Sequence, residues 1–339
     1  MGKLFGKSNS ILGIDIGTSN IKIAQVTHGP TAVLDTYGIV NMTYQLGGKN
    51  DELVIRQMAQ VLKSLMQRAN VTAKRCIISF PNSTVFSSVI QLPQMSDQEL
   101  GSAVEFEAKK YVPLALSEVD LSWEVIGPAA PGGGSQKILL TAAPKHIVNN
   151  YKTMLSLAGI SSEAGEIEAL ALIRSLIGEV HSNCVIIDIG ARSTGLNIIE
   201  NGYLRLSRNL NIGGDTITDK IAQSLNISFS RAEQFKKDFG VSSPTFIPDT
   251  IKPVLNIVKN EVKQLLTIYQ SQGVAVDKIL LVGGGANLPG IEGYFGDLGV
   301  KVELGDPLKS VAYDSALAPV LKRYSLSLPI AIGLALRNE

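Results

Sequence analysis

The chain has 339 residues, about twice the usual size of one domain, which indicates at least two lobes. Hydrophobic residues make up 45% and charged residues 18%, values that suit a folded protein and exclude a disordered one. The formal net charge of +1 excludes a strongly basic surface for nucleic acid or for anionic membranes.

Cysteine usage and the terminal sequences bear on the cellular compartment. Cys76 and Cys184 each begin an apolar run, so we expect buried reduced thiols instead of a disulfide or a metal site. The longest apolar stretches, such as residues 329–336, are shorter than the roughly 18 residues that span a bilayer. The first residues carry no hydrophobic signal core. We therefore expect a cytoplasmic protein.

The first half of the chain alternates between strand and helix patterns. Alternating apolar residues predict strands at 10–26 (two, joined by a polar turn), 33–42 (a second hairpin-like pair), 76–79, 84–92, 121–126 and 137–143. Apolar residues at helical spacing predict helices at 51–70, 96–111, 145–158 and 163–178. Ser96 and Glu99 form a capping box at the start of the second helix. Residues 128–134, rich in Pro and Gly, are expected to form a loop between two strands.

The second half begins in the same way. Its predicted strands are 183–189, 195–199, 203–208 and 278–282, and its predicted helices are 213–225, 230–239 and 250–272. Ser230 and Glu233 have the spacing of a capping box for the helix at 230–239. The last strand runs directly into three glycines at 283–285.

A short motif occurs once in each half. Ile14-Asp15-Ile16-Gly17 recurs as Ile187-Asp188-Ile189-Gly190, 173 residues later. Each copy has an apolar strand, Asp-Ile-Gly, a small polar turn and a returning apolar strand. This internal repeat predicts two similar lobes, each of which offers one glycine-containing hairpin to a ligand between them.

The first of these turns carries groups suited to phosphate. A tight glycine turn points consecutive backbone amides into one concavity, which can hold phosphate oxygens. A carboxylate at the end of the strand can hold the water shell of a magnesium ion. A plain β-hairpin with an Asx-type turn has the same pattern, so both interpretations stay open. The candidate residues are Asp15, Gly17, Thr18, Ser19, Asn20 and Lys22.

Two further segments add candidates. The second turn offers Asp188 as a second carboxylate on the magnesium side, together with Gly190, Ser193 and Thr194, whereas Arg192 either contacts phosphate or points to solvent. The glycine-rich segment Gly283, Gly284, Gly285 and Ala286 lets backbone approach a flat ligand such as adenine, or simply forms a tight strand-to-helix connection. It is neither a Walker A loop nor a G-x-G-x-x-G fingerprint.

The order of these motifs resembles the actin/Hsp70/sugar-kinase ATPase superfamily along essentially the whole chain. The resemblance implies an α/β fold in which two ribonuclease-H-like lobes clamp Mg-ATP. It implies that Asp15 and Asp188 hold the magnesium ion through water. It also implies that the nucleoside lies beside Gly213, Gly214, Asp215, Glu233, Lys236 and the segment 283–286.

Proteins of this superfamily carry a residue that positions the attacking water on the helix between the lobes. Glu168 falls at the matching place on the helix predicted at 163–178, and Glu166 lies beside it. A carboxylate near the terminal phosphate can orient water as a general base. An ordinary exposed helix carboxylate is the alternative interpretation for Glu168.

Other segments resemble a narrower family, the PilM proteins, which are actin-like proteins of type IV pilus assembly. These segments are the N-terminal residues 1–8 and residues 105–113, 119–123, 139–145 and 157–160. The resemblance implies an FtsA-type inserted subdomain, and a groove beside it that binds the cytoplasmic N-terminal tail of PilN. The candidate groove residues are Phe80, Val85, Phe86, Phe106, Tyr111 and Val112, for which burial in the core is the alternative.

The resemblance implies an ATP- or ADP-binding adaptor at the cytoplasmic face of the inner membrane. Its membrane attachment would come through PilN, with PilO as an indirect partner, possible self-association and no nucleic acid. Slow ATP hydrolysis is compatible with this role. The expected division is 1–83 (first lobe), 84–160 (inserted subdomain), 161–182 (connecting helix), 183–213 (second lobe, 2A), 214–277 (2B) and 278–339 (2A and return helix).

Two other functions fit the same fold. An FtsA-like filament would be expected to end in a basic amphipathic membrane helix, whereas residues 332–339 look like a last core helix. A small-molecule kinase would need an aspartate base beside its acceptor hydroxyl. Asp97 and Asp120 in the inserted segment are candidates, but they also suit a helix start and a strand end.

Overall fold

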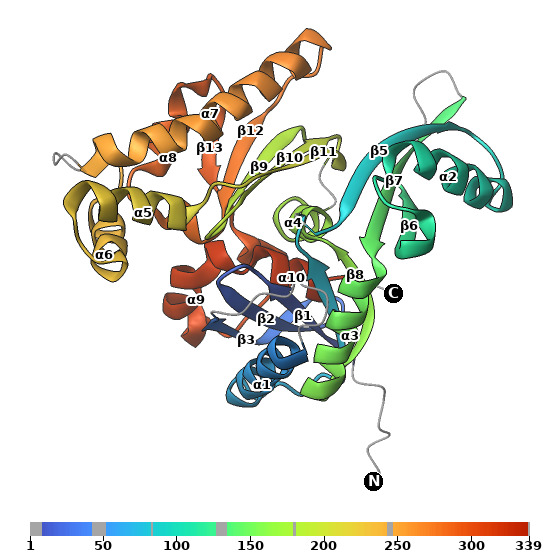
Figure 1. Cartoon of the computed structure of the whole chain (residues 1–339), viewed down its shortest axis with the longest axis horizontal. Helices are drawn as coiled ribbons and strands as arrows, with labels where there is room; N and C mark the ends of the chain where they lie inside the picture. Colours follow the sequence, from blue (N-terminus) through green and yellow to red (C-terminus); the bar gives the residue numbers. More distant parts are fainter. Residues whose placement is uncertain are drawn as a thin grey trace.

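The computed structural model describes residues 9–42, 52–82, 84–126, 134–178, 181–242 and 247–337. Within them the chain forms two five-stranded sheets, each with helices on it, and a separate three-stranded sheet to one side (Figure 1). The loop predicted at 128–134 lies almost entirely outside the described residues.

The first sheet is built around the first Asp-Ile-Gly motif. Its strands, in the order β3-β2-β1-β4-β8, are β1 (Ser10–Ile16), β2 (Asn20–Thr27), β3 (Val33–Asn41), β4 (Arg75–Phe80) and β8 (Ser161–Ile167). β2 is antiparallel to its neighbours β1 and β3, whereas β4 and β8 run parallel to β1. Every residue of β1 is buried, which explains its nearly continuous apolar sequence.

The second sheet repeats this arrangement strand for strand. Its order is β11-β10-β9-β12-β13, with β9 (Cys184–Ile189), β10 (Thr194–Glu200), β11 (Tyr203–Leu210), β12 (Lys278–Val282) and β13 (Lys301–Leu304). The hairpins β9–β10 and β10–β11 are antiparallel, and β12 and β13 are parallel to β9. The duplicated lobe predicted from the repeated motif is confirmed.

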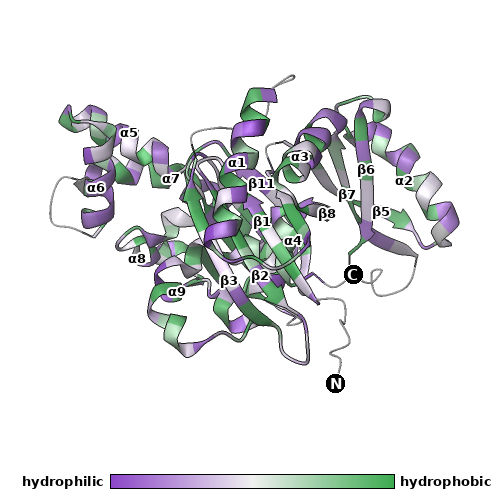
Figure 2. Cartoon of the chain, turned by 90° about the horizontal axis from the view of Figure 1, so that it is seen from below, coloured by the Kyte–Doolittle hydropathy of each residue, from purple (hydrophilic) through white to green (hydrophobic). Residues whose placement is uncertain are grey.

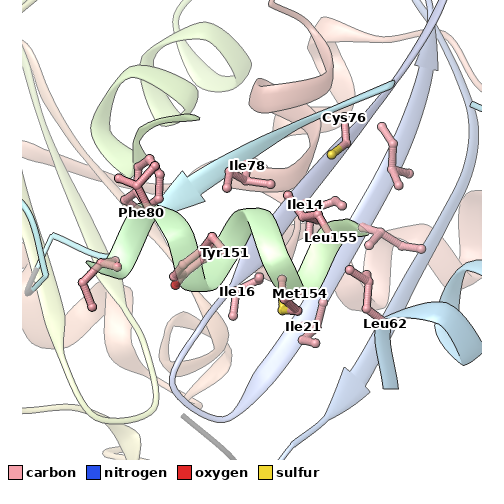
Figure 3. Close-up of a cluster of buried hydrophobic side chains, with 14 of the residues drawn as sticks. Ile14, Ile16, Ile21, Leu62, Cys76, Ile78, Phe80, Tyr151, Met154 and Leu155 are labelled. Atoms are coloured by element: carbon pink, nitrogen blue, oxygen red, sulfur yellow. The ribbon is translucent and has the colours of Figure 1, made fainter. Parts of the chain in front are cut away.

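Helices cover these sheets with their apolar faces. They are α1 (Glu52–Arg68) and α3 (Lys145–Ala158) on the first sheet, and α5 (Gly214–Leu225), α6 (Phe229–Phe239), α7 (Ile247–Ser271) and the short α8 (Ile291–Phe295) in the second lobe. In α1 the buried residues are Ile55, Met58, Ala59, Leu62 and Leu65, a helical stripe. Figure 3 shows α3 placing Tyr151, Met154 and Leu155 against the strands of the first sheet.

Two helices join the lobes: α4 (Glu168–Leu176), which leaves β8, and α10 (Pro329–Ala335), which follows α9 (Ala318–Tyr324). Their side chains share one core with strands of both sheets, including Ile11 and Ile186. A Cβ on Gly333 of α10 would overlap the backbone of Ala171 in α4, so only glycine permits this close crossing. The lobes are therefore held by packed helices instead of a loose linker.

The three-stranded sheet forms the inserted subdomain. It has the order β5-β7-β6, with β5 (Phe86–Pro93), β6 (Val119–Val125) and β7 (Ser135–Pro144), and α2 (Asp97–Tyr111) packs on it. The capping box of Ser96 and Glu99 is present as predicted. The next helix, α3, packs on α1 and shares the core of the first lobe. The division at residue 160 stays a prediction, and a division by packing would end the insertion at Pro144.

Three local predictions are wrong. Residues 161–167, expected in part to begin a helix, form β8. They pair in parallel with the edge of β4 that does not bond to β1. Residues 33–41 form one strand instead of a hairpin-like pair, since the whole segment pairs with β2. The cap of α6 is Ser228, not Ser230, and its hydroxyl accepts a hydrogen bond from the Arg231 amide.

Hydropathy follows this architecture. The central strands of the first sheet are mostly hydrophobic, whereas α6, at the rim of the second lobe, is mostly hydrophilic (Figure 2). Among the described helices, none combines the length and apolarity that crossing a bilayer requires. Cys76 and Cys184 are buried free thiols, as expected.

Candidate functional site

A cleft of about 720 Å³ lies between the two lobes. This volume is in the range of sites for small molecules and cofactors. Both hairpin turns and the glycine-rich segment after β12 contribute to it. Of the residues predicted from sequence, its lining includes Asp15, Gly17, Thr18, Ser19, Asn20, Lys22, Glu168, Asp188, Gly190, Ser193, Gly214, Asp215, Glu233, Lys236, Gly283, Gly284 and Gly285.

The first turn is closed by one backbone hydrogen bond, from the Gly17 amide to the Asn20 carbonyl at 3.0 Å. The strand register sets Asp15 directly opposite Lys22, and the Lys22 ammonium lies 2.8 Å from Asp15 Oδ2. Ser79, on the neighbouring β4, donates a hydrogen bond to Asp15 Oδ1 at 3.2 Å. Asp15 is therefore buried with its charge compensated and both oxygens bonded.

The second turn has the same closing hydrogen bond, from the Gly190 amide to the Ser193 carbonyl at 2.9 Å. Its outer side is packed against the start of α5: the amides of Gly214 and Asp215 donate to the carbonyls of Gly190 and Ala191 at 2.9 and 2.7 Å. A Cβ on Gly213 would lie within 3 Å of both carbonyl oxygens, which explains the glycine. These contacts fix the position of the turn at the cleft.

Three carboxylates that line the cleft from both lobes, those of Asp15, Asp188 and Glu168, act electrostatically on Lys22. Burial, followed by the nearby charges of Asp15 and Asp188, raises the pKa of Glu168 to about 8. Burial also raises the pKa of Asp188 to about 6 despite the nearby Lys22. Burial acts to lower the pKa of Lys22, but the ion pair with Asp15 outweighs it and the net direction is upward. The base of the cleft thus has more buried acidic than basic groups.

This composition fits a cation that arrives with its own ligands. The described residues contain no cluster of three or more acidic, histidine or cysteine side chains of the kind that holds a metal ion alone. Mg²⁺ commonly binds through one or two carboxylates, retained waters and the phosphates of a substrate. One aspartate from each lobe, Asp15 and Asp188, matches that requirement.

The third glycine segment is fixed by its contact with the second turn. Gly283 has φ +84°, and a Cβ there would collide with the Asp188 carboxylate and the Ile189 carbonyl. The Gly283 amide donates to the Leu326 carbonyl at 2.7 Å. A Cβ on Gly284, by contrast, would meet only Ser327 Oγ at 4.0 Å. Glycine at position 283 thus lets this segment pack closely against the end of β9, whereas Gly284 presents bare backbone to the cleft.

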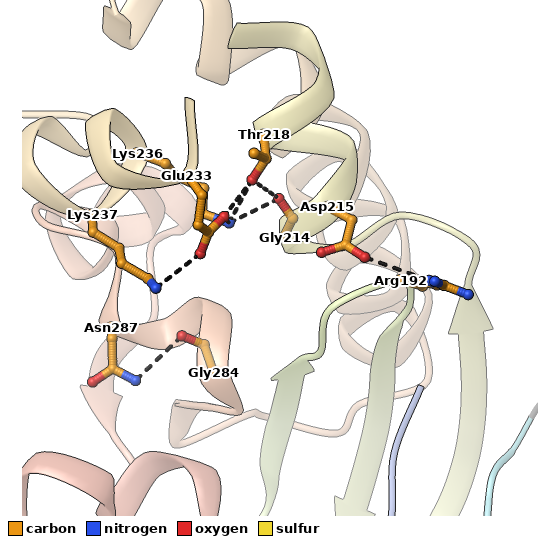
Figure 4. A network of polar contacts seen from close by, with 9 residues as sticks. All are labelled: Arg192, Gly214, Asp215, Thr218, Glu233, Lys236, Lys237, Gly284 and Asn287. Carbon is orange, nitrogen blue, oxygen red and sulfur yellow. Dashed lines mark hydrogen bonds and ion pairs between the residues drawn. The ribbon is translucent and has the colours of Figure 1, made fainter. Parts of the chain in front are cut away.

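Glu233 and Lys236 belong to a polar network that joins α5 to α6 (Figure 4). Glu233 accepts a hydrogen bond from the Thr218 hydroxyl at 2.6 Å and pairs with Lys236 at 2.6 Å. The Lys236 ammonium also donates to the Gly214 carbonyl at 3.0 Å. Glu233 therefore does not cap α6, as the sequence suggested, but helps to hold the wall of the cleft formed by these two helices.

Some sequence candidates do not line the cleft. The Thr194 hydroxyl donates to the Ile212 carbonyl, Gly213 packs against the second turn, and Ala286 is buried in the second core. Arg192 is half-exposed and its Nε lies 3.5 Å from Asp215 Oδ2. Glu166 is also outside the cleft, buried on β8 and paired with Arg174 and Arg337 at 2.8 and 3.2 Å. Of the two glutamates considered, Glu168 alone reaches the cleft.

The cleft also contains residues that sequence reasoning missed. Among them are Asn41, Asn82, Asn209, Phe229, Lys237, Asn287, Arg323, Tyr324 and Ser327. Asn82 could have been predicted from the sequence, because it follows the strand β4 and so lies at the same end of the sheet as Asp15. Lys237 and Asn287 directly follow the candidates Lys236 and Ala286, whereas the others come from segments that have no motif and that only the fold brings to the cleft.

The six residues predicted to form a partner groove fall into two groups. Phe80, Val85 and Val112 are buried in cores, and Phe80 packs edge-on against Tyr151 at 5.2 Å. Phe106 and Tyr111 on α2 are 64% and 47% exposed, and Phe86 is partly buried. A partner can reach the second group without any rearrangement of the cores.

The fold and the site can now be compared with known proteins. The family model described as type IV pilus assembly protein PilM matches residues 13–339. The chain belongs to the PilM family. A solved PilM–PilN type IV pilus biogenesis complex is 27% identical, with a TM-score of 0.86 over 96% of this chain and 98% of that one. The family resemblance inferred from the sequence blocks is confirmed.

More distant relatives show which fold the PilM family shares with other proteins. The cell division protein FtsA of Streptococcus pneumoniae is 25% identical over 91% of this chain and 78% of its own length. MreB5 of Spiroplasma citri, solved bound to AMPPNP, is 14% identical with a TM-score of 0.55 over 97% of this chain and 95% of that one. The second likeness shows the fold alone, and together they confirm the two-lobed actin-like fold.

Proposed function

We propose that this PilM-family protein is a nucleotide-binding adaptor of the inner-membrane complex that assembles type IV pili, with Mg-ATP or Mg-ADP in the interlobe cleft. The observation that carries the proposal is the convergence of both Asp-Ile-Gly turns on one cleft. The AMPPNP-bound MreB5 structure, with the same fold, supports a nucleotide as the ligand.

Each group in the cleft has a role in this proposal. The backbone amides of the two turns and the Lys22 ammonium bind phosphate oxygens. Asp15 and Asp188 hold a magnesium ion through water, and that ion would supply neutralisation of the phosphate charge. The wall formed by Glu233, Lys236 and the segment 283–285 accommodates the nucleoside. Glu168 lies where a carboxylate can orient a water molecule, so slow hydrolysis is compatible with the site.

The partner proposal follows from the family. The PilM–PilN complex, with which this chain shares its fold over 96% of its length, supports PilN as the partner. We propose that the N-terminal cytoplasmic tail of PilN binds the surface beside the inserted subdomain. Exposed Phe106 and Tyr111 are suited to receive apolar side chains of such a peptide. In this arrangement the protein lies at the cytoplasmic face of the inner membrane, held there by PilN and indirectly linked to PilO.

The adaptor role can be tested by calorimetric titration with a synthetic peptide of the N-terminal tail of PilN from the same organism, with and without Mg-ATP. Saturable one-to-one binding is the expected result. A peptide affinity that changes with Mg-ATP would mean that nucleotide and partner sites are coupled. Absence of binding in both conditions would contradict the adaptor role. Sedimentation of polymers with ATP would then test an FtsA-like filament, and ATP consumption dependent on an added sugar would test a kinase.

The nucleotide site can be tested by Asp15→Asn. This change removes the buried charge but leaves groups that can still bond to Lys22 and Ser79. We expect Mg-ATP affinity, measured by titration of a fluorescent ATP analogue, to fall at least tenfold while the circular dichroism spectrum stays unchanged. Asp219→Asn on the exposed face of α5 is the matched control. Equal affinity of both variants would show that the first turn does not bind the phosphate–magnesium group.

A further inference from the structure

Asn82 occupies a position shared by three parts of the molecule. It follows β4 of the first lobe, it lines the cleft, and four residues later the chain enters β5 of the inserted subdomain. In Figure 1, β5 starts from the first lobe close to β11 of the second lobe. No other described segment leads from the base of the cleft directly into the inserted sheet.

The bonds of Asn82 reach across the lobe boundary. Its backbone amide donates to Glu168 Oε2 at 3.5 Å, and its side-chain amide donates to the Ser207 hydroxyl of β11 at 3.5 Å. Ser207 in turn donates to Asn197 Oδ1 of β10 at 2.8 Å. A short polar chain thus runs from a carboxylate of the cleft, through Asn82, into the second lobe.

This polar chain is incompletely bonded. Asn82 Oδ1 and Asn197 Nδ2 are buried, and neither has a hydrogen-bond partner among the described residues. One is an acceptor and the other a donor. The amide nitrogens Asn82 Nδ2 and Asn197 Nδ2 lie 3.9 and 3.7 Å from the point that a Cβ on Gly195 would occupy, so the two side chains approach the same residue. Leaving such buried groups unpaired costs free energy, typically about 1–3 kcal/mol each.

The two bonds from Asn82 are also long. At 3.5 Å they are near the limit of a hydrogen bond, whereas 2.9 Å is typical for N–H···O. A small approach of the second lobe toward Asn82 would shorten the bond to Ser207 and bring Asn82 closer to Asn197, whereas Glu168 follows β8 of the first lobe. The polar chain therefore favours a more closed arrangement of the lobes than the one described.

The inserted subdomain also contacts the same edge of the second lobe. Lys137 on β7 pairs with Glu200 on β10 at 3.4 Å. Leu204 of β11 is buried in one core with Val85, at the entry to β5, and with Leu139 of β7. Because the edge formed by β10 and β11 touches both Asn82 and the inserted sheet, movement of the second lobe is transmitted to both.

We infer that Asn82, with Ser207 and Asn197, forms an interlobe latch that is completed when the cleft closes on its ligand and that changes the position of the inserted subdomain. Asn82 acts here as a positioning residue. The inference rests on the proposed function for the ligand of the cleft, and it extends that function by naming the contact through which nucleotide reaches the partner surface.

The test measures a distance that does not depend on PilN. Ser122→Cys on the inserted subdomain and Gln264→Cys on α7 are exposed positions for spin labels, and the native cysteines are buried and so protected. Pulsed electron paramagnetic resonance would give the label-to-label distance with and without Mg-AMPPNP. We expect a shift on nucleotide binding in the otherwise unchanged chain. We expect this shift to be lost in Asn82→Ala and in Ser207→Ala, with no further loss in the double variant.

Asn149→Ala, an exposed asparagine on α3, is the matched control and is expected to keep the full shift. A full shift in Asn82→Ala, with Mg-AMPPNP bound, would overturn the latch and leave the proposed function intact. Nucleotide binding without any shift in the unchanged chain would also overturn the latch. Failure of Mg-AMPPNP to bind the unchanged chain would overturn the nucleotide proposal and the latch with it, which the binding titration distinguishes.

Discussion

The two hairpins share the Asp-Ile-Gly sequence, the strand register and the hydrogen bond that closes the turn, but they differ in the residue opposite the aspartate. In the first, Asp15 pairs across the strands with Lys22; in the second, the equivalent Asp188 pairs with Gly195. Asp15 is therefore neutralised by an ion pair at 2.8 Å, whereas burial raises the pKa of Asp188 to about 6. The duplicated lobes thus present one compensated and one uncompensated carboxylate to the same cleft.

This difference assigns different tasks to the two halves. The paired Asp15 stabilises its hairpin whether or not a ligand is bound. The uncompensated Asp188, near Glu168, leaves excess negative charge that a cation arriving with the ligand would neutralise. The carboxylate of the first turn is thus neutralised without a ligand, whereas the charge of the carboxylate in the second turn is neutralised only when the ligand and its cation bind. Substitutions at Lys22, at the two aspartates and at the glycines beside Asp188 test this contrast.

The largest effect is expected from Lys22→Met, which removes the cation from the first hairpin. Asp15 would then be buried without its ion-pair partner, beside two other carboxylates. Removing one partner of a buried ion pair typically costs about 3–5 kcal/mol, and we expect a loss of this order in the free energy of unfolding. Urea titration would measure it, with Lys63→Met on the exposed face of α1 as the control. Equal midpoints for the two variants would contradict the contrast.

The second effect, from Asp188→Asn, has the opposite sign. Because the folded-state pKa of Asp188 is raised from 3.8 to about 6, its burial costs stability increasingly as pH rises from about 4 to 6. At pH 7 this cost is on the order of 3 kcal/mol. In EDTA, Asp188→Asn should therefore raise the free energy of unfolding at pH 7, and the gain should disappear toward pH 4.

Asp15→Asn is the matched comparison for Asp188→Asn and is expected to lower the free energy of unfolding at pH 7, since it weakens the pair with Lys22. Both asparagine variants should bind Mg-ATP more weakly. Destabilisation by both changes to the same extent would show that the two aspartates are equivalent and would remove the basis of the contrast.

The smallest effect is expected from the glycines beside Asp188. Gly283→Ala places a Cβ against the Asp188 carboxylate at a positive φ, and we expect a loss of about 2 kcal/mol in the free energy of unfolding. Gly284→Ala meets nothing closer than 4.0 Å, so its effect should stay within about 0.5 kcal/mol. Thermal unfolding of the two variants side by side would check the difference. A larger loss for Gly284→Ala would contradict the predicted packing.

Much of the cleft could be predicted from local sequence. The two hairpins were visible because strand alternation and a polar glycine turn are encoded within about 17 residues. The Ser96–Glu99 capping box was equally local. The start of α6 was not local in this way, because Ser228 and Ser230 are both available as its N-cap. Ser228 caps the helix, and Glu233, the expected capping partner of Ser230, bonds instead to Thr218 of another helix.

The prediction of a helix over 163–178 shows the limit most clearly. Residues 161–167 contain Glu and Ala, which are compatible with a helix, but they form a parallel strand on β4, more than 80 residues earlier in the chain. Glu166 is then buried between Arg174 and Arg337, and Glu168 becomes the first residue of α4. No local pattern contains that pairing.

The sequence by itself determined the duplicated hairpins, the two aspartates and the glycine turns, because each depends on neighbouring residues and on strand or helix periodicity. The tertiary structure decided which of these residues meet. It placed Glu168 instead of Glu166 in the cleft and brought Asn82 to Ser207. Those outcomes depend on parallel strand pairing and on the packing of α4 and α10 between the sheets, interactions between segments far apart in the chain.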